Sequence, residues 1–355
     1  MDDRRPLKIL QVCSASQAVY GAVQSLLVLA KAQREAGHTV EFLTFAGKKF
    51  GEQVREMGFT VHETKVRAKV DPLAILRMRR LMRDRGYDII HTHLSTSSVN
   101  GCLAARAAGL PSVATVHGMS SKISFAAATH MIAVSEEIKR HLVSQGVKPE
   151  IVSVVYNGYE LVGEPGQVRS EGDLFPVLGT VARVTPLKGI DNAIRAVAIL
   201  KRDFPTISYL VVGDGIGVEP CKALADELGV ADNVHFVGYR RDIETFLTRM
   251  DLFVFPSLKE GMGIALVEAM AQGLATVATN IGGIPEVITP DCGILVPAKN
   301  PDELAREISK LLTNSELRAS MASAAQKRAA DVFSVSAMES STYDVYQRLL
   351  SASAA

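Results

Sequence analysis

The sequence predicts an α/β protein with two doubly wound, Rossmann-like parallel-sheet domains that face each other across a cleft. Short apolar runs alternate with helix-like segments along nearly the whole chain, the pattern of consecutive βα units. This series stops at a polar stretch containing Gly and Pro, residues 163–173, and then starts again. A chain of 355 residues is also long for one hydrophobic core and suits two domains.

The first series predicts an N-terminal domain over residues 1–165. Apolar runs give strands over residues 8–12, 40–45, 88–91, 113–116, 131–134 and 152–155. Helices are predicted over residues 23–36, where Gly37 ends the helix, and over about 98–108. Residues 163–173 are the predicted linker.

The second series predicts a C-terminal domain over residues 174–335. Its strands are expected over residues 177–181, 209–212, 234–237, 252–255, 276–278 and 294–296. A last helical segment, residues 336–350, has no strand after it. We expect residues 336–355 to pack back toward the N-terminal domain.

Composition limits the kind of protein. Hydrophobic residues make up 47% and charged residues 22%, which is globular. Residues 1–165 hold 21 Lys/Arg against 15 Asp/Glu, whereas the remainder holds 18 against 23, so the two halves differ in sign. The four scattered cysteines form no CxxC pair and predict reduced thiols. No apolar run reaches about 18 residues, so we expect a cytoplasmic protein, with contact at the inner face of a membrane left open.

The most informative segment is DLFVFPSLKEGMGIALVEAMAQGLATVAT, residues 251–279. It predicts a strand, a loop with Glu260, a helix from about Ile264 carrying Glu268, and a second strand. Ligands of open α/β sheets bind at the carboxyl ends of strands, and free N–H groups at a helix start favour an anion. Ionised carboxylates accept hydrogen bonds from hydroxyls. Hydroxyls beside phosphates describe a nucleotide-sugar; the alternative is an ordinary βα unit with two solvated glutamates.

A nicotinamide dehydrogenase is disfavoured. Residues 213–217 follow a strand, but they read GxGxG and lack the glycine spacing of a dinucleotide site. The first strand leads to Ser14-Ala15-Ser16 with no GxGxxG.

Taken together, the motifs resemble glycosyltransferase family 4, retaining enzymes of the GT-B architecture, over nearly the whole chain. The most specific element is Glu-x7-Glu, from Glu260 to Glu268. Further matches are ARVTPLKG, VVGDG, VHFVGY, GGIPEVI and GILVPAKNPDELA in the second half. The first half adds GAVQSLLVLA, AGHTV, DIIHTH, VATVHG, AVSEEIKRHL and VYNGYE.

The resemblance implies a donor site in the C-terminal domain. It assigns Arg183 and Lys188 to the diphosphate, Glu268 to the donor ribose and Glu260 to a hydroxyl of the donor sugar. Cations suit the charge that grows on a departing diphosphate, so no metal or other cofactor is expected, and no Asp-x-Asp pair is present. Backbone groups complete the expected donor contacts: Gly21, Gly238, Gly261, Met262, Gly263 and Ile264.

Two departures from the family pattern affect these contacts. The usual glycine pair after the first strand is Gly21-Ala22, and the aromatic residue common after the first glutamate is Met262.

Histidines of the N-terminal domain are further candidates. His117 ends the VATVHG strand, and the resemblance places its counterpart beside the donor sugar; the alternative is a structural histidine. His91 and His93, at i and i+2, point the same way on a strand. No other ligand lies at suitable spacing for a metal, and we expect His93 to line the acceptor cleft.

A basic segment, residues 65–85, carries eight cations and two acids. On a helical wheel an apolar stripe opposes an arginine-rich side. Either the stripe packs on the domain and the arginines are solvated, or the arginines dock on anionic lipid. The stripe comprises Ile75, Met78, Leu81 and Met82, and the other side Arg77, Arg79, Arg80 and Arg83.

By resemblance, the expected activity is metal-independent transfer of a hexose-type sugar from a UDP- or GDP-sugar to a hydroxyl acceptor, with retention of configuration. The acceptor would be a glycan or lipid-linked molecule of bacterial cell-surface polysaccharide or lipopolysaccharide assembly. Nucleic acid is not an expected partner. A nucleotide-sugar epimerase of similar architecture and an inactive nucleotide-sugar-binding scaffold remain alternatives.

Overall fold

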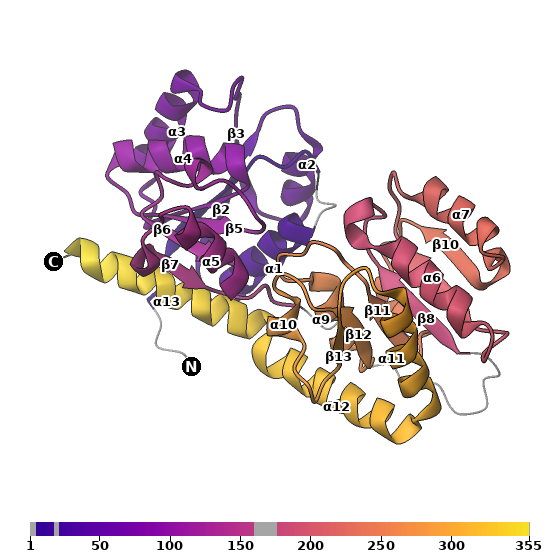
Figure 1. Cartoon of the computed structure of the whole chain (residues 1–355). Helices are drawn as coiled ribbons and strands as arrows, with labels where there is room; N and C mark the ends of the chain where they lie inside the picture. The colour runs from indigo at the N-terminus through magenta and orange to yellow at the C-terminus, as the bar shows by residue number, and fades with distance from the viewer. Residues whose placement is uncertain (1–4, 18–20, 160–175, 355) are drawn as a thin grey trace. The chain divides into compact units, whose positions relative to one another are not determined.

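The computed structural model describes residues 5–17, 21–159 and 176–354, and the predicted linker lies outside them. The chain divides into two compact units (Figure 1). Unit 1 comprises Met1–Gly158 with Ser334–Ala355, and unit 2 comprises Tyr159–Phe333. None of the helices in the described ranges combines the length and apolar character needed to cross a bilayer.

In unit 1 the described residues form a seven-stranded sheet with the order β3-β2-β1-β4-β5-β6-β7, and every pairing is parallel. The chain leaves β1 in one direction to β2 and β3, and then crosses back to β4. This reversal makes a topological switch between β1 and β4. The strands are β1 Lys8–Cys13, β2 Thr39–Phe45, β3 Thr60–Thr64, β4 Ile89–His93, β5 Ser112–Val116, β6 His130–Ala133 and β7 Val152–Val154.

Helices cover this sheet, because its apolar strands must be buried on both faces. α1 packs against α13, the long C-terminal helix drawn in yellow, and α3 packs against α4 (Figure 1). The helices are α1 Gly21–Glu35, α2 Lys49–Glu56, α3 Pro72–Arg85, α4 Ser95–Ala108, α5 Glu136–Ser144 and α13 Val335–Ala354, with 3₁₀ turns η1 Lys122–Ser124 and η2 Pro149–Ile151.

In unit 2 the described residues form a six-stranded parallel sheet with the order β10-β9-β8-β11-β12-β13. The order reverses between β8 and β11, which makes a second switch point. The strands are β8 Val177–Val181, β9 Ser208–Val212, β10 Val234–Gly238, β11 Leu252–Phe255, β12 Thr276–Thr279 and β13 Ile294–Val296.

Helices of unit 2 flank its sheet, and α6 and α11 bury apolar faces in the same core. They are α6 Ile190–Leu200, α7 Val218–Glu227, α8 Ile243–Leu247, α9 Ile264–Ala271, α10 Ile284–Val287, α11 Pro301–Thr313 and α12 Ser315–Val332, with 3₁₀ turns η3 Pro186–Lys188 and η4 Ala231–Asn233. The prediction of two doubly wound parallel sheets is confirmed.

Local signals explain where elements begin and end. Asp71 accepts hydrogen bonds from the N–H groups of Leu73 and Ala74, and Pro72 occupies the first turn, so α3 begins there. Gly86, at φ 61°, ends the same helix in the left-handed conformation.

Three details differ from the sequence prediction. Strand β3 was missed, because TVHET has one buried residue and lies at the sheet edge, where the apolar pattern is weak. Strand β4 continues through His93, because its polar residues find buried partners. Helix α1 begins at Gly21, two residues before the predicted start, so Gly21 is a helical residue rather than a loop residue.

Candidate active site

The candidate site lies at the carboxyl edge of the unit 2 sheet, at the switch between β8 and β11. The loop after β8 carries Arg183 and Lys188, and the loop after β11 carries Glu260. The carboxyl ends of neighbouring parallel strands meet at one edge. Residues separated by more than 70 positions in the sequence therefore come together.

Glycines let these loops touch backbone to backbone. At Gly189, φ is 62°, and a Cβ would lie 2.0 Å from the Pro256 carbonyl oxygen, so only glycine fits. The N–H of Leu258 donates to the carbonyl of Leu187 at 2.8 Å and ties the two loops together. At Gly282, φ is 53° and a Cβ would lie 2.1 Å from the Glu260 carbonyl oxygen, which brings in the loop after β12.

Lys188 and Glu260 form an ion pair between the loops. Lys188 Nζ lies 2.5 Å from Glu260 Oε2, and the side chains are 23% and 16% exposed. The Gly261 N–H donates to Glu260 Oε1 at 3.2 Å, and Lys188 Nζ lies 5.8 Å from the Phe255 ring centroid. Both charges are thus held in place while solvent still reaches them.

The remaining glycine-rich loops support the Arg183 segment. Ideal Cβ atoms at Gly213 and Gly215 would lie 1.9 and 2.2 Å from the carbonyl oxygens of Ala182 and Val184. These contacts fix the backbone on both sides of Arg183, whose side chain is exposed. Gly238, at the end of β10, accepts a 2.9 Å hydrogen bond from the Gly213 N–H.

Helix α9 starts at the same edge and carries Glu268. Gly263 caps it at φ 96°, where a Cβ would lie 3.1 Å from the Phe255 ring, and Ile264 is the first helical residue. Met262 is buried, at 2% exposure. The loop therefore delivers Glu260 to the N-terminal end of α9.

Glu268 is half-buried on this helix. Burial first, and the neighbouring negative charge of Glu244 second, raise the pKa of the Glu268 carboxyl to about 7. No cation pairs with Glu268 among the residues that the structure describes. A carboxylate in such surroundings is stabilised by any ligand that donates hydrogen bonds to it.

In unit 1, His117 directly follows β5, and its Nε2 lies 3.4 Å from His93 Nδ1. Burial lowers the pKa of His117 to about 4, so the ring is neutral at pH 7. Within the described ranges, His117 Nδ1 has no hydrogen-bond partner.

His93 is almost fully buried, and both of its nitrogens are occupied, because Nε2 bonds to Gln11 Oε1 at 2.9 Å. Its ring contacts His91, with centroids 4.3 Å apart. His93 is thus placed to orient His117, and its burial leaves it little surface with which to line the acceptor cleft expected from the sequence. The sequence interpretation missed three residues, because no local motif marks them. Gln11 of β1 bonds to His93, Tyr346 of α13 bonds to His91, and Gln33 of α1 bonds to both Gln11 and Tyr346.

Two family models match the chain. The model described as Glycosyltransferase Family 4 matches residues 19–162, and the model described as Glycosyl transferases group 1 matches residues 169–328. Together they span both units. The chain belongs to glycosyltransferase family 4.

Relatives of this family 4 chain include the Escherichia coli UDP-Gal:alpha-D-GlcNAc-diphosphoundecaprenol alpha-1,3-galactosyltransferase, 31% identical over 60% of this chain. The alignment covers 63% of that relative's length. The Mycobacterium ulcerans D-inositol 3-phosphate glycosyltransferase is 30% identical over 73% of this chain and 64% of the relative. The chain thus spans a little less than two thirds of the length of these two relatives.

Solved structures agree in fold with this family 4 chain. Anabaena HepE in complex with UDP has a TM-score of 0.85 at 24% identity, covering 97% of this chain and 100% of HepE. TarM has a TM-score of 0.80 at 12% identity, covering 98% of this chain and 100% of TarM. The two Rossmann-like domains are those of the GT-B fold.

Proposed function

We propose that this chain moves a hexose-type sugar from a UDP- or GDP-sugar to a hydroxyl acceptor, with retention of configuration. The observation that carries the proposal is the Lys188–Glu260 pair at the β8/β11 switch, with Glu268 on the adjoining helix. A cation and two carboxylates at this edge match a ligand that combines phosphates with hydroxyls.

Each group has a distinct task in this scheme. When the sugar leaves, the bond between C1 and the diphosphate oxygen breaks, and its electron pair goes to the diphosphate. Lys188 and Arg183 stabilise the charge that grows there. Glu268 accepts the ribose hydroxyls, and Glu260 accepts a sugar hydroxyl while keeping Lys188 oriented. Protein cations therefore do the work that a divalent metal does in other sugar transferases, and transfer needs no metal.

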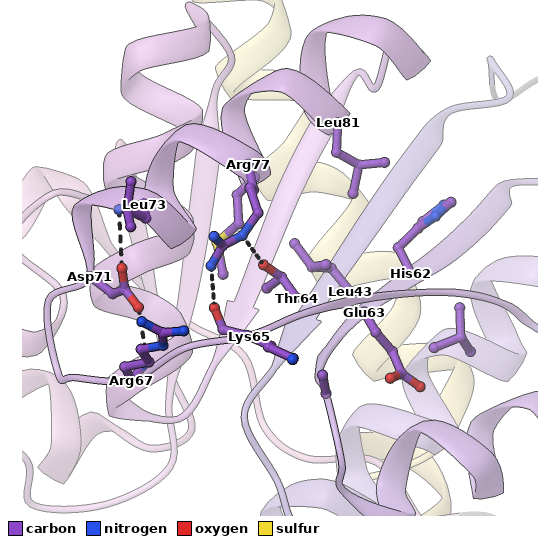
Figure 2. Close-up of a pocket in the computed structure, with 13 residues that line it drawn as sticks. Leu43, His62, Glu63, Thr64, Lys65, Arg67, Asp71, Leu73, Arg77 and Leu81 are labelled. Carbon is purple, nitrogen blue, oxygen red and sulfur yellow. Dashed lines mark hydrogen bonds between the residues drawn. The ribbon is translucent and has the colours of Figure 1, made fainter.

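For the acceptor we propose a groove in unit 1, of about 690 Å³, between the edge strand β3 and helix α3 (Figure 2). Such a volume is within the range of small-molecule sites. Part of its lining is apolar, and the close-up labels Leu43, Leu73 and Leu81 among the lining residues. An acceptor with an apolar portion matches this part of the lining.

The groove is also cationic. Arg77 donates to the Lys65 carbonyl at 2.6 Å and to Thr64 Oγ1 at 3.3 Å, which fixes its guanidinium within the groove lining (Figure 2). The acids nearby have partners: Glu63 pairs with Arg55 at 2.5 Å, and Asp71 accepts three backbone N–H bonds.

Lys65 and Arg67 have no ion-pair partner among the described residues. Arg77 interacts with Asp71, because its charge, after the backbone N–H bonds, helps to lower the pKa of that carboxyl. We infer an acceptor that carries a phosphate or similar anion on an apolar chain. In an assay with such an acceptor, Lys65→Gln combined with Arg67→Gln should raise acceptor KM and leave nucleotide affinity unchanged. An unchanged acceptor KM would remove the groove from the acceptor site.

Helix α3 is the surface proposed to meet the membrane. Its buried side holds Met78 and Met82, yet Leu73 and Leu76 on the outside are 60% and 55% exposed. Arg80 and Arg83 are exposed on the same helix. Leucines beside arginines suit a bilayer with anionic headgroups, each cation near it contributing about 1 kcal/mol. We therefore propose that the enzyme works at the cytoplasmic face of a bacterial membrane, in cell-surface polysaccharide or lipopolysaccharide assembly.

The proposal is tested by screening UDP-glucose, UDP-GlcNAc, UDP-galactose and GDP-mannose for thermal stabilisation of the protein. The donor that binds is then incubated with polyprenyl-diphosphate-linked sugars. Acceptor-dependent release of the nucleoside diphosphate supports transfer. Epimerised donor without acceptor identifies an epimerase, and tight binding without turnover identifies a scaffold; either result overturns the proposal.

A further inference from the structure

A continuous series of hydrogen bonds, here called the relay, links His117 to the C-terminal helix of unit 1. His117 Nε2 meets His93 Nδ1 at 3.4 Å, and His93 Nε2 meets Gln11 Oε1 at 2.9 Å. Gln11 Nε2 meets Gln33 Oε1 at 2.9 Å, and Gln33 Nε2 meets the Tyr346 hydroxyl at 3.1 Å. The same hydroxyl lies 2.6 Å from Nδ1 of His91, whose Nε2 meets Thr115 Oγ1 at 2.7 Å.

Because the relay is buried, its members must satisfy each other. Gln11, Gln33, His91, His93 and Tyr346 are each at most 2% exposed. Burial lowers the pKa of His91 to about 3 and that of His93 well below its usual range. All three histidines are therefore neutral at pH 7, and each ring has one N–H donor and one lone pair.

Tyr346 determines the direction of the relay. A phenol, with an ordinary pKa of about 10, is a stronger donor than a neutral imidazole N–H, and an imidazole nitrogen is a stronger acceptor than a phenol oxygen. The Tyr346 hydroxyl therefore donates to His91 Nδ1. Its oxygen is left to accept from the Gln33 amide, in agreement with the amide orientation in the structure.

The direction of the Tyr346 bond fixes which group donates and which accepts in each of the other hydrogen bonds. The Gln33 carbonyl accepts from the Gln11 amide, and the Gln11 carbonyl accepts from Nε2–H of His93. His93 Nδ1 is then a lone pair and accepts from Nε2–H of His117. Nδ1 of His117, which has no partner among the described residues, is consequently a lone pair too.

We propose that Tyr346 fixes the tautomer of His117 through Gln33, Gln11 and His93, so that Nδ1 of His117 stays unprotonated and can only accept a hydrogen bond. Tyr346, Gln33, Gln11 and His93 are positioning residues, and the tautomer does not depend on the proposed function. If the side-chain amides of Gln11 and Gln33 were both rotated by 180°, every donor and acceptor in the relay would exchange roles. His117 would then carry its proton on Nδ1, as a donor that suits a carbonyl or phosphate oxygen.

The tautomer is measured directly on the full-length protein labelled with ¹⁵N-histidine. Two-bond ¹H–¹⁵N correlation spectra at pH 7 distinguish Nε2–H from Nδ1–H rings, and His117→Gln assigns the signal. The expected result is Nε2–H with unprotonated Nδ1 at His117, unchanged between pH 6 and pH 8. An Nδ1–H signal overturns the proposal.

Two variants test the role of Tyr346. Tyr346→Phe removes the directing hydroxyl, and Gln11→Met interrupts the relay while leaving Tyr346 and the packing of α13 in place. Each should convert the His117 signal to a mixture of tautomers. The control is Tyr343→Phe on the same helix, whose hydroxyl bonds to the Arg5 carbonyl and whose ring stacks on His38. A wild-type His117 signal in both relay variants would show that Tyr346 does not set the tautomer.

Discussion

Binding of the donor should be coupled to the ionisation of Glu268. Burial and the charge of Glu244 raise the pKa of this carboxyl to about 7 in the donor-free protein. Ribose hydroxyls are best held by the ionised form, which only accepts hydrogen bonds. About nine-tenths of the carboxyl is ionised at pH 8 but only about a tenth at pH 6. Affinity for the nucleotide-sugar should therefore fall roughly nine- to ten-fold between these pH values.

Calorimetric titration with UDP-glucose or GDP-mannose, whichever binds, measures this effect. A nucleotide-sugar is the better probe, because free UDP carries a terminal phosphate that titrates near pH 6 (about one unit from the expected midpoint). Glu268→Gln keeps the size of the side chain and should remove the pH dependence. Glu244→Gln removes the like charge and should move the midpoint to lower pH.

Two results would contradict a ribose contact by ionised Glu268. Donor affinity that is constant from pH 6 to pH 8 would show that Glu268 does not contact the ribose in its ionised form. The same slope in wild type and Glu268→Gln would assign the titration to another group. Titration in buffers of different ionisation enthalpy independently counts the protons that are released on binding. Close to one proton should be released per donor bound at pH 6.

Further predictions concern the stability of the protein, its independence of metal, the anomeric configuration of the product and the binding of vesicles. Without donor, the stability of the wild-type protein should decline between about pH 4.5 and 7, because the Glu268 carboxyl keeps its proton to a higher pH in the native protein than in the unfolded chain. Glu268→Gln should therefore raise the free energy of unfolding at pH 8 by up to roughly 3 kcal/mol. Denaturant unfolding measures this, and equal stability of the two proteins at pH 8 would contradict it. Addition of EDTA should leave donor turnover intact; loss that Mg²⁺ restores would refute metal independence. Proton NMR of the initial product should show the anomeric configuration of the donor, and an inverted product contradicts retention. Arg80→Gln with Arg83→Gln should weaken flotation with phosphatidylglycerol vesicles at low salt, unlike Lys48→Gln with Lys148→Gln; wild-type protein that ignores these vesicles would make α3 a solvated face.

Most of the fold could be predicted from the sequence because buried parallel strands are short, nearly continuous apolar runs. Strands β8, β11 and β13 were predicted with the bounds that the structure has. Strand β3 could not be found in this way, because an edge strand with one buried residue lacks that signal. The exposed Leu73 and Leu76 were also missed, because a helical wheel does not show which side of α3 the sheet covers.

The candidate site likewise contains residues that the sequence could predict and contacts that it could not. The loop residues Lys188 and Glu260 are marked by local motifs, and the sheet order explains why they meet. The pKa of Glu268 is raised by burial first and by the charge of Glu244 second; Glu244 belongs to another helix, and no local pattern predicts that neighbour. The bond between His91 and Tyr346 joins residues 255 positions apart. Long-range contacts of this kind determine protonation, and they become visible only when the chain is folded.

We expect the loops at the β8/β11 switch to bind a nucleoside diphosphate. Calorimetric titration of UDP and GDP into wild type, Lys188→Gln and Arg195→Gln tests it directly, because Arg195 is an exposed cation on the neighbouring helix α6. We predict one site for one of the nucleotides, with affinity lowered about ten-fold or more in Lys188→Gln and unchanged in Arg195→Gln. Binding that Lys188→Gln leaves intact, or no binding of either nucleotide, would contradict it.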